Sequence, residues 1–419
     1  MKKIFRTLFV TSIILVCFHS PSAAQWNGIF DSNYPDRQKE VGFAGEYFIS
    51  SDAVTVEFQN TYLNDNFIDN DLKDKTFKKM NGEPVLGSGL DAGFYYSSRS
   101  EKNEEHSWFV NVRHRQHYNS TFTPDMFGLY FYGNKMYAGK TADLSDLNYL
   151  NIRYNQFQYG IVRKLSGDSS GWTFRGGVSF LLGENYLDIK TDRGSFYTHP
   201  EAEYVELDIF LESKQSDSTN TGFGKVNGVG GSVDLALQYL KQGKYILRFG
   251  IKDAGIIAWN SKSTSFEIDT LYRFEGELIE NFFDSLFLDI KSEGEFTDGF
   301  KENRKEEGFK TMIPLKAEFS YGRFVIPDKL TLWASADYIF NADYTPYIQL
   351  WNDYYISKRF MAGISFRYGG YAEIGAGIHL AADLGKGYIL QAGTSYISGF
   401  ISSSSATAQG GSFGLRKKF

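Results

Sequence analysis

The stretch RFMAGISFRYGGYAEIGAGIHL, residues 359–380, decides the fold, because its apolar residues alternate with polar or small ones. One face of its first half carries Phe360, Ala362, Ile364, Phe366 and Tyr368. The other face carries Arg359, Met361, Gly363, Ser365, Arg367 and Gly369. A side-chain period of two residues is the period of a β-strand. The stretch therefore predicts strands with one apolar and one wet face.

The same alternation continues to the end of the chain. It covers Tyr388 to Tyr396 and returns in Phe413, Leu415 and the last residue, Phe419. A final strand that ends on an aromatic residue resembles the assembly signal of bacterial outer-membrane β-barrels. We therefore expect outer-membrane lipid and the barrel-assembly machinery among the partners of this chain.

The composition favours the same class. Aromatic residues make up 17% of the chain, and 42 of its 419 residues are glycine. Aromatic-rich alternating segments are typical of membrane barrels, in which aromatic side chains form girdles at the two interfaces. A soluble secreted β-sandwich would show the same alternation. The terminal Phe419 and the length without a domain break favour the barrel, so we predict an all-β transmembrane antiparallel barrel.

The first 24 residues read as an export signal. Lys2, Lys3 and Arg6 form a basic start, Leu8 to Phe18 is mostly apolar, and Ser22-Ala23-Ala24 is a small-residue cleavage site. Cleavage would leave a mature chain from Gln25, exported toward the bacterial outer membrane.

The predicted cleavage also changes the chemistry of the chain. The only cysteine, Cys17, lies in the signal, and Val16 stands where a lipoprotein signal usually needs a small residue. We expect no disulfide in the mature chain. Removing three positive charges takes the formal net charge from −6 to −9, which argues against nucleic acid as a partner.

Residues 25–85 predict an N-terminal periplasmic segment. Ala53 to Asn60 alternates like a first strand, and Asn64 to Met80 changes to helical spacing. This short helix could fold into the barrel mouth as a hatch, or it could lie on the periplasmic surface.

Residues 86–419 predict the barrel itself. Single-chain bacterial barrels use an even number of strands, and the alternating segments predict about fourteen. The apolar set of residues 150–161 changes face near Gln156, which suggests a bulge. Leu278 to Ile290 repeats at three and four residues, so a large loop near residues 275–308 is expected to carry an amphipathic helix.

The alternation also predicts which charged side chains face the lumen. The candidates are Arg113, Arg115, Arg153, Arg175, Glu206, Asp208, Asp234, Arg248, Lys316, Glu318, Asp337, Arg359, Arg367 and Glu373. Eight are basic and six acidic. A pore selective for one ion sign would favour one sign along its wall. Two interpretations stay open, a cross-linked structural interior and a polar constriction that meets a solute.

No motif points to a metal, a cofactor or an enzyme. His114 and His117 are three residues apart on a predicted strand, so they should face opposite sides. The acidic residues from Asp65 to Asp74 lack the central glycine and terminal glutamate of a calcium loop. No serine and histidine stand in a pattern with the geometry of a hydrolase site. We expect no cofactor and no enzymatic activity.

Three short motifs give the chain a resemblance to a known family. They are Asn66-Phe67-Ile68-Asp69-Asn70-Asp71-Leu72-Lys73, then Met312-Ile313-Pro314-Leu315-Lys316, and the C-terminal meander that ends at Phe419. With these the chain resembles FadL-like outer-membrane barrels, and more closely the uncharacterised barrels of that type in Bacteroidota. The resemblance implies fourteen strands and an N-terminal hatch.

The resemblance also suggests two kinds of function. Transporting members pass hydrophobic molecules, so the first hypothesis is a passive, porin-like channel for a small hydrophobic solute. Related barrels serve as subunits of secretion and gliding machinery, so the second is a structural or partner-binding barrel of an envelope assembly. One departure from the barrel pattern is Lys417, an outward position that is usually apolar.

Overall fold

The structure is a computed structural model that describes residues 39–100, 105–165, 170–275 and 304–419. The export signal predicted over residues 1–24 lies outside the described residues. So does the amphipathic helix predicted over Leu278 to Ile290, and both stay predictions.

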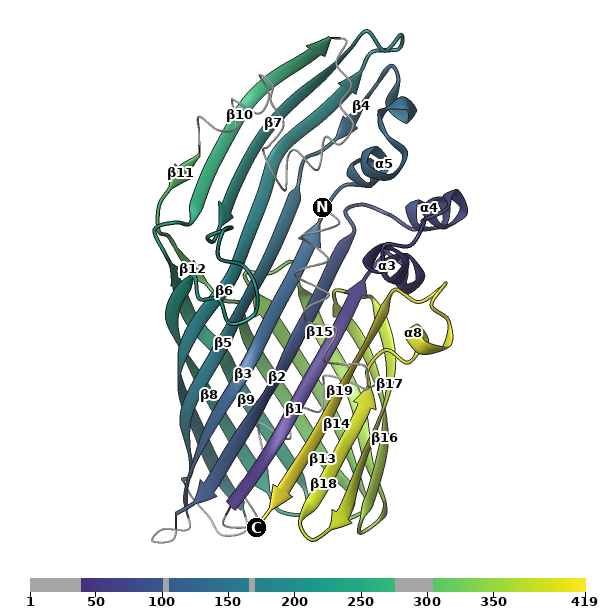
Figure 1. Cartoon of the computed structure of the whole chain (residues 1–419). Helices are drawn as coiled ribbons and strands as arrows, with labels where there is room; N and C mark the ends of the chain where they lie inside the picture. The colour runs from purple at the N-terminus through teal and green to yellow at the C-terminus, as the bar shows by residue number, and fades with distance from the viewer. Residues whose placement is uncertain (1–38, 101–104, 166–169, 276–303) are drawn as a thin grey trace.

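Fourteen antiparallel strands close into a barrel (Figure 1), which confirms the predicted fold class. The barrel is closed by the pairing of its first strand with its last. In this pairing Phe43 lies opposite Leu415, and Gly45 lies opposite Phe413. In order around the barrel the strands are β1 (Lys39–Ser51), β2 (Val85–Arg99), β3 (His106–Thr121), β5 (Leu147–Lys164), β6 (Ser170–Thr198), β8 (Gly228–Lys241), β9 (Tyr245–Trp259), β13 (Leu315–Ile326), β14 (Leu330–Phe340), β15 (Thr345–Ser357), β16 (Phe360–Gly370), β17 (Ile374–Gly385), β18 (Tyr388–Thr394) and β19 (Ala408–Lys418).

The first strand lies earlier in the chain than the sequence pattern predicted. Residues 39–51 form β1, whereas the expected strand at residues 53–60 is mostly the helix α3 (Val56–Leu63). Thr55 caps this helix, because its Oγ1 accepts a hydrogen bond from the Phe58 N–H at 3.3 Å. Glycine obscures the alternation in β1: at Gly42 an added Cβ would lie 2.3 Å from the ring of Tyr95.

The outer face of the barrel is apolar. Ile364 and Phe366 are 52% and 59% exposed, while Ser365 between them is 4% exposed, so the predicted faces of β16 are confirmed. Aromatic side chains meet along one rim, joining Tyr96 to Trp108, Trp108 to Tyr159, Trp172 to Tyr239, Tyr239 to Tyr245, and Tyr245 to Tyr321. An apolar band with an aromatic girdle is the surface that a bilayer requires.

The last strand carries its predicted aromatic and apolar residues on this outer face. Leu415 is 38% exposed and Phe419 58% exposed. The ammonium of Lys417 lies 5.0 Å from the ring centre of Tyr388 and 4.6 Å from that of Phe419. A lysine in this position places its charge at the membrane interface. The role of Phe413, Leu415 and Phe419 as an assembly signal stays a prediction.

Among the described residues, no helix is both long and apolar enough to cross a membrane.

The two ends of the barrel differ. At the turn end, where β1 begins and β19 ends, short turns such as residues 242–244 and 386–387 join the strands. At the opposite, loop end the connections are longer and carry the helices α3, α4 (Asn70–Phe77), α5 (Pro124–Tyr132) and α8 (Ser398–Ile401). In bacterial barrels the short turns face the periplasm. By this rule we expect the loop end to face away from the periplasm.

The sheet continues beyond the barrel at the loop end, and this extension is called the outer sheet below. β6 has 29 residues, far more than the roughly 10 that cross a bilayer. Its first half pairs with β8 in the barrel wall, and its second half pairs with β7 (Tyr204–Gln215). The strands β4 (Lys140–Asp143) and β10 (Thr264–Glu275) extend this outer sheet, and β11 (Lys305–Glu306) and β12 (Lys310–Met312) lead the chain back to β13.

The outer sheet has its own hydrophobic core. α5 and the 3-10 helix η2 (Asn134–Tyr137) pack against one face of the sheet. The core residues of this cluster are Met126, Leu129, Tyr137, Ala142, Leu144, Leu147, Ile189, Phe196, Leu207, Ile209, Leu211 and Ile268. Burial of these side chains explains why the strands remain paired outside the membrane.

The extra residue expected in β5 near Gln156 is absent, because β5 pairs with β3 in one unbroken register; its register shifts only against β6, between Arg153 and Tyr154, where the extra residue is Glu184 of β6. Ile152 is fully buried inside, whereas Tyr159 is 53% exposed on the outer face. The strand keeps its period of two while its surroundings change. Above the membrane the inner face packs in an apolar cluster with Leu181, Ile257 and Trp259. Within the membrane the outer face of β5 contacts lipid. The apolar residues of β5 therefore lie on its inner face above the membrane and on its outer face within it.

Candidate functional site

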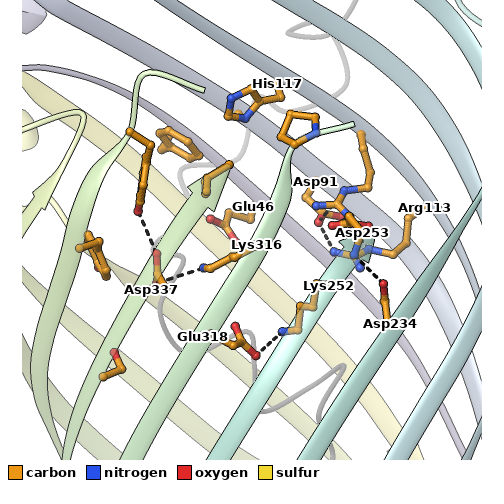
Figure 2. A pocket seen from close by; sticks show the side chains of 18 of the residues that line it. Glu46, Asp91, Arg113, His117, Asp234, Lys252, Asp253, Lys316, Glu318 and Asp337 are labelled. Carbon is orange, nitrogen blue, oxygen red and sulfur yellow. Dashed lines mark hydrogen bonds and ion pairs between the residues drawn. The ribbon is translucent and has the colours of Figure 1, made fainter. Parts of the chain in front are cut away.

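A cavity of about 230 Å³ lies inside the barrel and is called the chamber below. Most of the barrel strands contribute to its wall, and Figure 2 shows the charged side chains that point into it. The predicted lumen-facing residues that line it are Arg113, Arg115, Arg175, Asp234, Lys316, Glu318, Asp337 and Arg367. Eight of the fourteen candidates therefore lie on the wall of one cavity.

Charged pairs connect neighbouring strands on one side of the chamber. Arg113 forms a bidentate contact with Asp91 across β2 and β3. Arg115 lies 3.4 Å from Asp91 and also reaches Asp253 on β9, at 2.5 Å. These pairs join β2, β3 and β9, which are not all neighbours in the sheet. The network therefore reaches across the lumen as well as along the wall.

Two further ion pairs extend this charged side. Lys252 lies 2.9 Å from Glu318, and Lys316 lies 3.1 Å from Asp337 (Figure 2). Asp234 accepts hydrogen bonds from the Gln158 amide and the Asp253 N–H, both at 2.7 Å. Because acidic and basic groups neutralise one another, this wall presents dipoles rather than a net charge.

The other side of the chamber is aromatic. Phe48, Tyr344, Tyr347, Tyr371 and Tyr396 all contribute to the lining. Tyr344 and Tyr371 meet edge to face with ring centres 5.0 Å apart, and Tyr371 stacks on Phe48 at 6.3 Å. The lining thus combines a polar half with an apolar half. Sequence alternation missed these tyrosines because most lie in or beside loops.

Two loops from one side of the barrel cross the loop end of the lumen. These crossing loops are residues 341–344, between β14 and β15, and residues 371–373, between β16 and β17. The first is fixed by Asp343, which accepts hydrogen bonds from the Asn119 amide at 3.2 Å, the Thr121 hydroxyl at 2.8 Å and the Asn148 amide at 2.8 Å. β3 and β5, which supply the donors, are at least five strands away around the barrel.

The second crossing loop inserts Tyr371, which is 2% exposed. Its hydroxyl lies 2.9 Å from Nε2 of His117 on β3. Gly369 and Gly370 have φ angles of 90° and 79°, which glycine adopts without strain, and they turn the chain inward. Gly87 leaves the space for the ring, since a Cβ there would lie 2.1 Å from it. The two loops together cover the chamber.

Five of the predicted lumen residues lie elsewhere. Glu206 and Asp208 are on β7 in the outer sheet, where they pair with Arg273 and Arg193 in exposed contacts. Period-two alternation cannot tell a barrel strand from a strand of the outer sheet. Arg359 and Glu373 lie in exposed connections at the two ends of β16. Their spacing continued the strand pattern past the point where the strand ends.

Arg153 faces the outside of the wall, so its predicted lumen position is wrong. Its neighbour Tyr154 lines the chamber, and adjacent strand residues point to opposite faces. Arg153 and Glu184 are 3% and 1% exposed and lie 2.8 Å apart. The pair sits where the β5–β6 register shifts between Arg153 and Tyr154. The loop of residues 216–227 covers it, because Arg153 donates to the Gly222 carbonyl at 3.2 Å.

Arg248, the remaining candidate, faces the interior but lies outside the chamber lining. Its guanidinium carbon is 4.8 Å from the ring centre of Trp333, and its Nε donates to the Gln238 side chain at 2.9 Å. This contact belongs to the turn-end half of β8 and β9. It fills the interior there rather than meeting the chamber.

The helix predicted over residues 64–80 coincides in part with α4, Asn70–Phe77, which lies at the loop end of the barrel. α3, α4 and α5 meet in an aromatic cluster, in which Phe58 lies 5.4 Å from Phe127 and 5.0 Å from Phe131 between ring centres. None of the residues 52–80 lines the chamber. A hatch role for this segment stays a prediction.

The described residues hold no group of three or more His, Cys, Asp or Glu that could bind a metal ion. His114 and His117 behave differently, as their spacing predicted. His114 Nδ1 lies 2.9 Å from the Asn155 side chain on the outside of the wall, and His117 faces Tyr371 in the lumen.

The sequence model of a family described as being of unknown function, DUF5723, matches residues 42–390. No curated protein matches the chain. Three solved structures are similar over nearly their whole length. The toluene transporter TodX of Pseudomonas putida is 9% identical, over 96% of this chain and 95% of that one, with a TM-score of 0.46.

A FadL homologue of Pseudomonas aeruginosa is 11% identical, over 95% of this chain and 98% of its own, with a TM-score of 0.47. The toluene transporter TbuX of Ralstonia pickettii is 8% identical, over 91% of this chain and 90% of its own, with a TM-score of 0.44. At these identities the similarity says nothing about the solute of the present chain.

Proposed function

We propose that this chain, which belongs to the DUF5723 family of unknown function, is a passive channel of the bacterial outer membrane for small organic solutes with an apolar part. The observation that carries the proposal is the chamber inside a closed barrel. A barrel of fourteen strands is wider than its own side chains fill, so its lumen is either open or closed by other parts of the chain. Here loops cover the lumen at one end.

The residues that line the chamber favour a small solute with an apolar part. Phe48, Tyr371 and Tyr396 offer ring faces to an apolar group. On the other side, acidic and basic residues occur in equal numbers, so the wall does not select one ion sign. A chamber of about 230 Å³ is smaller than the roughly 300–1,000 Å³ of pockets for drug-sized ligands. A small, largely apolar solute therefore suits it, as the resemblance implied.

The closure at the loop end is of a kind that can open. The loop of residues 341–344 is joined to the far wall of the barrel by the three hydrogen bonds of one side chain, Asp343. These three hydrogen bonds can break and re-form without disturbing the strands, because each barrel strand is paired on both sides within the sheet. The crossing loops would then act as a gate above a rigid wall.

Solute flux into liposomes tests the proposal. The refolded chain with Asp343→Ala, which frees one crossing loop, should admit phenethyl alcohol and other small neutral solutes. In that background Ser335→Trp should reduce the flux, because Ser335 lines the chamber. The matched control is Ala334→Trp, whose side chain points from the same strand toward lipid.

The comparison of flux requires that both variants fold. Both tryptophan variants must remain folded barrels, shown by their resistance to unfolding in detergent at room temperature. Equal flux through the two variants would mean that solute does not pass through the chamber. Absence of flux from every folded form would overturn the channel function.

A structural or partner-binding role is the second candidate. The outer sheet of β6, β7 and β10 favours it, because it projects beyond the membrane and is not needed to close the barrel. Mild cross-linking in the native membrane should then capture an envelope protein through residues of β7 or β10. If the same protein is captured after the cross-linkable residues of β7 and β10 have been replaced, the outer sheet does not bind it, and this result would count against the role.

A further inference from the structure

Within the part of the chain that the structure describes, two charged side chains of the chamber, one acidic and one basic, have no oppositely charged group in direct contact. The lining of the chamber contains six acidic residues, Glu46, Asp91, Asp234, Asp253, Glu318 and Asp337, and six basic ones, Arg113, Arg115, Arg175, Lys252, Lys316 and Arg367. Ion pairs or hydrogen bonds engage most of them, as described above. Among the described residues, Glu46 forms neither an ion pair nor a hydrogen bond, and Arg367 forms no ion pair and leaves two nitrogens without a hydrogen-bond partner.

Arg367 is buried, with 6% of its surface exposed, and its Nε and Nη2 have no hydrogen-bond partner. The rings of Tyr396 and Tyr347 flank the guanidinium, at 4.0 Å and 5.4 Å from its carbon to the ring centres. Its cross-strand neighbour Gln349 also has an unsatisfied side-chain oxygen. A buried guanidinium without a carboxylate is costly, and such a group calls for an anionic partner.

Glu46 is the complementary group. It lies on β1 directly opposite Asp91 on β2, and two like charges in this position repel each other. Arg113 and Arg115 both bind Asp91, so neither pairs with Glu46. Figure 2 shows Glu46 beside Lys316, whose ammonium is bound to Asp337. The Glu46 carboxylate is thus left to receive a cation in the chamber.

An aromatic patch connects these two groups. Phe48 follows Glu46 by two residues and so shares its strand face. Phe48 packs in one cluster with Tyr396, the residue whose ring lies on Arg367. Tyr371 stacks on Phe48 from above. A ligand lying on this patch would have a carboxylate near one end and a guanidinium near the other.

We infer that the chamber binds small zwitterions that carry an apolar group, such as aromatic amino acids. Glu46 receives the ammonium, Arg367 receives the carboxylate, and the patch of Phe48, Tyr371 and Tyr396 receives the apolar group. A molecule with both charges balances both residues at once, whereas an ion of one sign leaves the other residue uncompensated. This inference rests on the proposed channel function and names its solute class.

Four probes of similar size separate the charges: phenylalanine, phenethylamine, 3-phenylpropionate and phenethyl alcohol. Binding of each to the refolded full-length chain in detergent, measured by calorimetry, should be tightest for phenylalanine by about tenfold or more, since contacts to charged groups are worth that factor. Glu46→Gln should reduce phenylalanine binding to the level of 3-phenylpropionate. Arg367→Met should reduce it to the level of phenethylamine.

Glu206→Gln, which removes a carboxylate of the outer sheet, is the control and should leave the preference unchanged. Equal binding of the four probes, no binding of phenylalanine, or an undiminished preference in folded Glu46→Gln would overturn the inference. Binding is measured without a membrane, so its failure is distinct from failure of the channel. Flux of phenethyl alcohol without selective phenylalanine binding would leave a channel for a different solute.

Discussion

Replacing Asp343 by alanine should release the loop of residues 341–344 from the far wall of the barrel. The change removes a carboxylate that accepts three hydrogen bonds, from Asn119, Thr121 and Asn148. It touches no strand pairing, because residues 341–344 lie between β14 and β15. The barrel should therefore fold as before while its cover opens more often.

The contacts set the size of the effect. A hydrogen bond to a charged acceptor contributes about 1.5–3 kcal/mol, and the lower end applies because Asp343 is only half-buried. Three such bonds, partly replaced by water in the open state, give a change of roughly 3–4 kcal/mol in the closing free energy. Because about 1.4 kcal/mol is a factor of ten, the open population should rise by two to three orders of magnitude.

Liposome swelling with a small neutral solute measures this change as a rate. Asp343→Ala should raise the rate strongly, and Asp343→Asn should give an intermediate rate because it keeps one acceptor oxygen. Asp71→Ala removes a carboxylate at the same end of the barrel, from an exposed helix, and should have no effect. The reasoning is refuted if Asp343→Ala and Asp71→Ala swell at the same rate as the wild type while both are folded.

Three further predictions concern the wall and the helices. Ile364→Arg should lower the yield of folded barrel in lipid, since an arginine at the bilayer midplane costs about 2–4 kcal/mol, and Ile364→Val should not. Glu184→Ala leaves Arg153 buried without its partner and should reduce the free energy of unfolding by about 3–5 kcal/mol in guanidinium titrations, whereas Arg193→Ala, in an exposed pair, should leave it nearly unchanged. A similar loss in both would contradict the assigned burial. Phe58→Ala should make α3 and α4 more susceptible to limited proteolysis, because it removes a ring from their aromatic cluster, while Phe67→Ala, 88% exposed in the native chain, should leave the cleavage rate unchanged.

The sequence allowed the wall of the barrel to be predicted where lipid imposes the pattern. Ile364 and Ser365 lie on the expected faces, since the membrane tolerates only apolar side chains on one side of β16. β1 was missed because Gly45 interrupts its outward apolar set, while the apolar Ala44 and Phe48 lie on its inward face. The residue types on the inward face of a strand depend on the distant residues that they contact, and not on the alternation along the strand.

The same limit explains the errors in the candidate site. β7 alternates like a barrel strand, but it pairs with β10 and the far half of β6 outside the membrane. Arg153 was assigned to the wrong face because the apolar residues of β5 change side along the strand. Glu46 and Arg367 lack ion pairs because Asp91 binds Arg113 and Asp337 binds Lys316. These pairings join different strands, so the alternation along one strand cannot predict them.

The measurement that tests the central claim most directly is single-channel conductance in a planar bilayer, for the refolded chain from Gln25 onward. The wild type should be mostly closed, with brief openings. The double variant Asp343→Ala, Tyr371→Ala, in which both crossing loops lose their contacts, should show long openings of one conductance. Silence of the folded double variant would mean that no path runs through the chamber, and it would contradict a channel function.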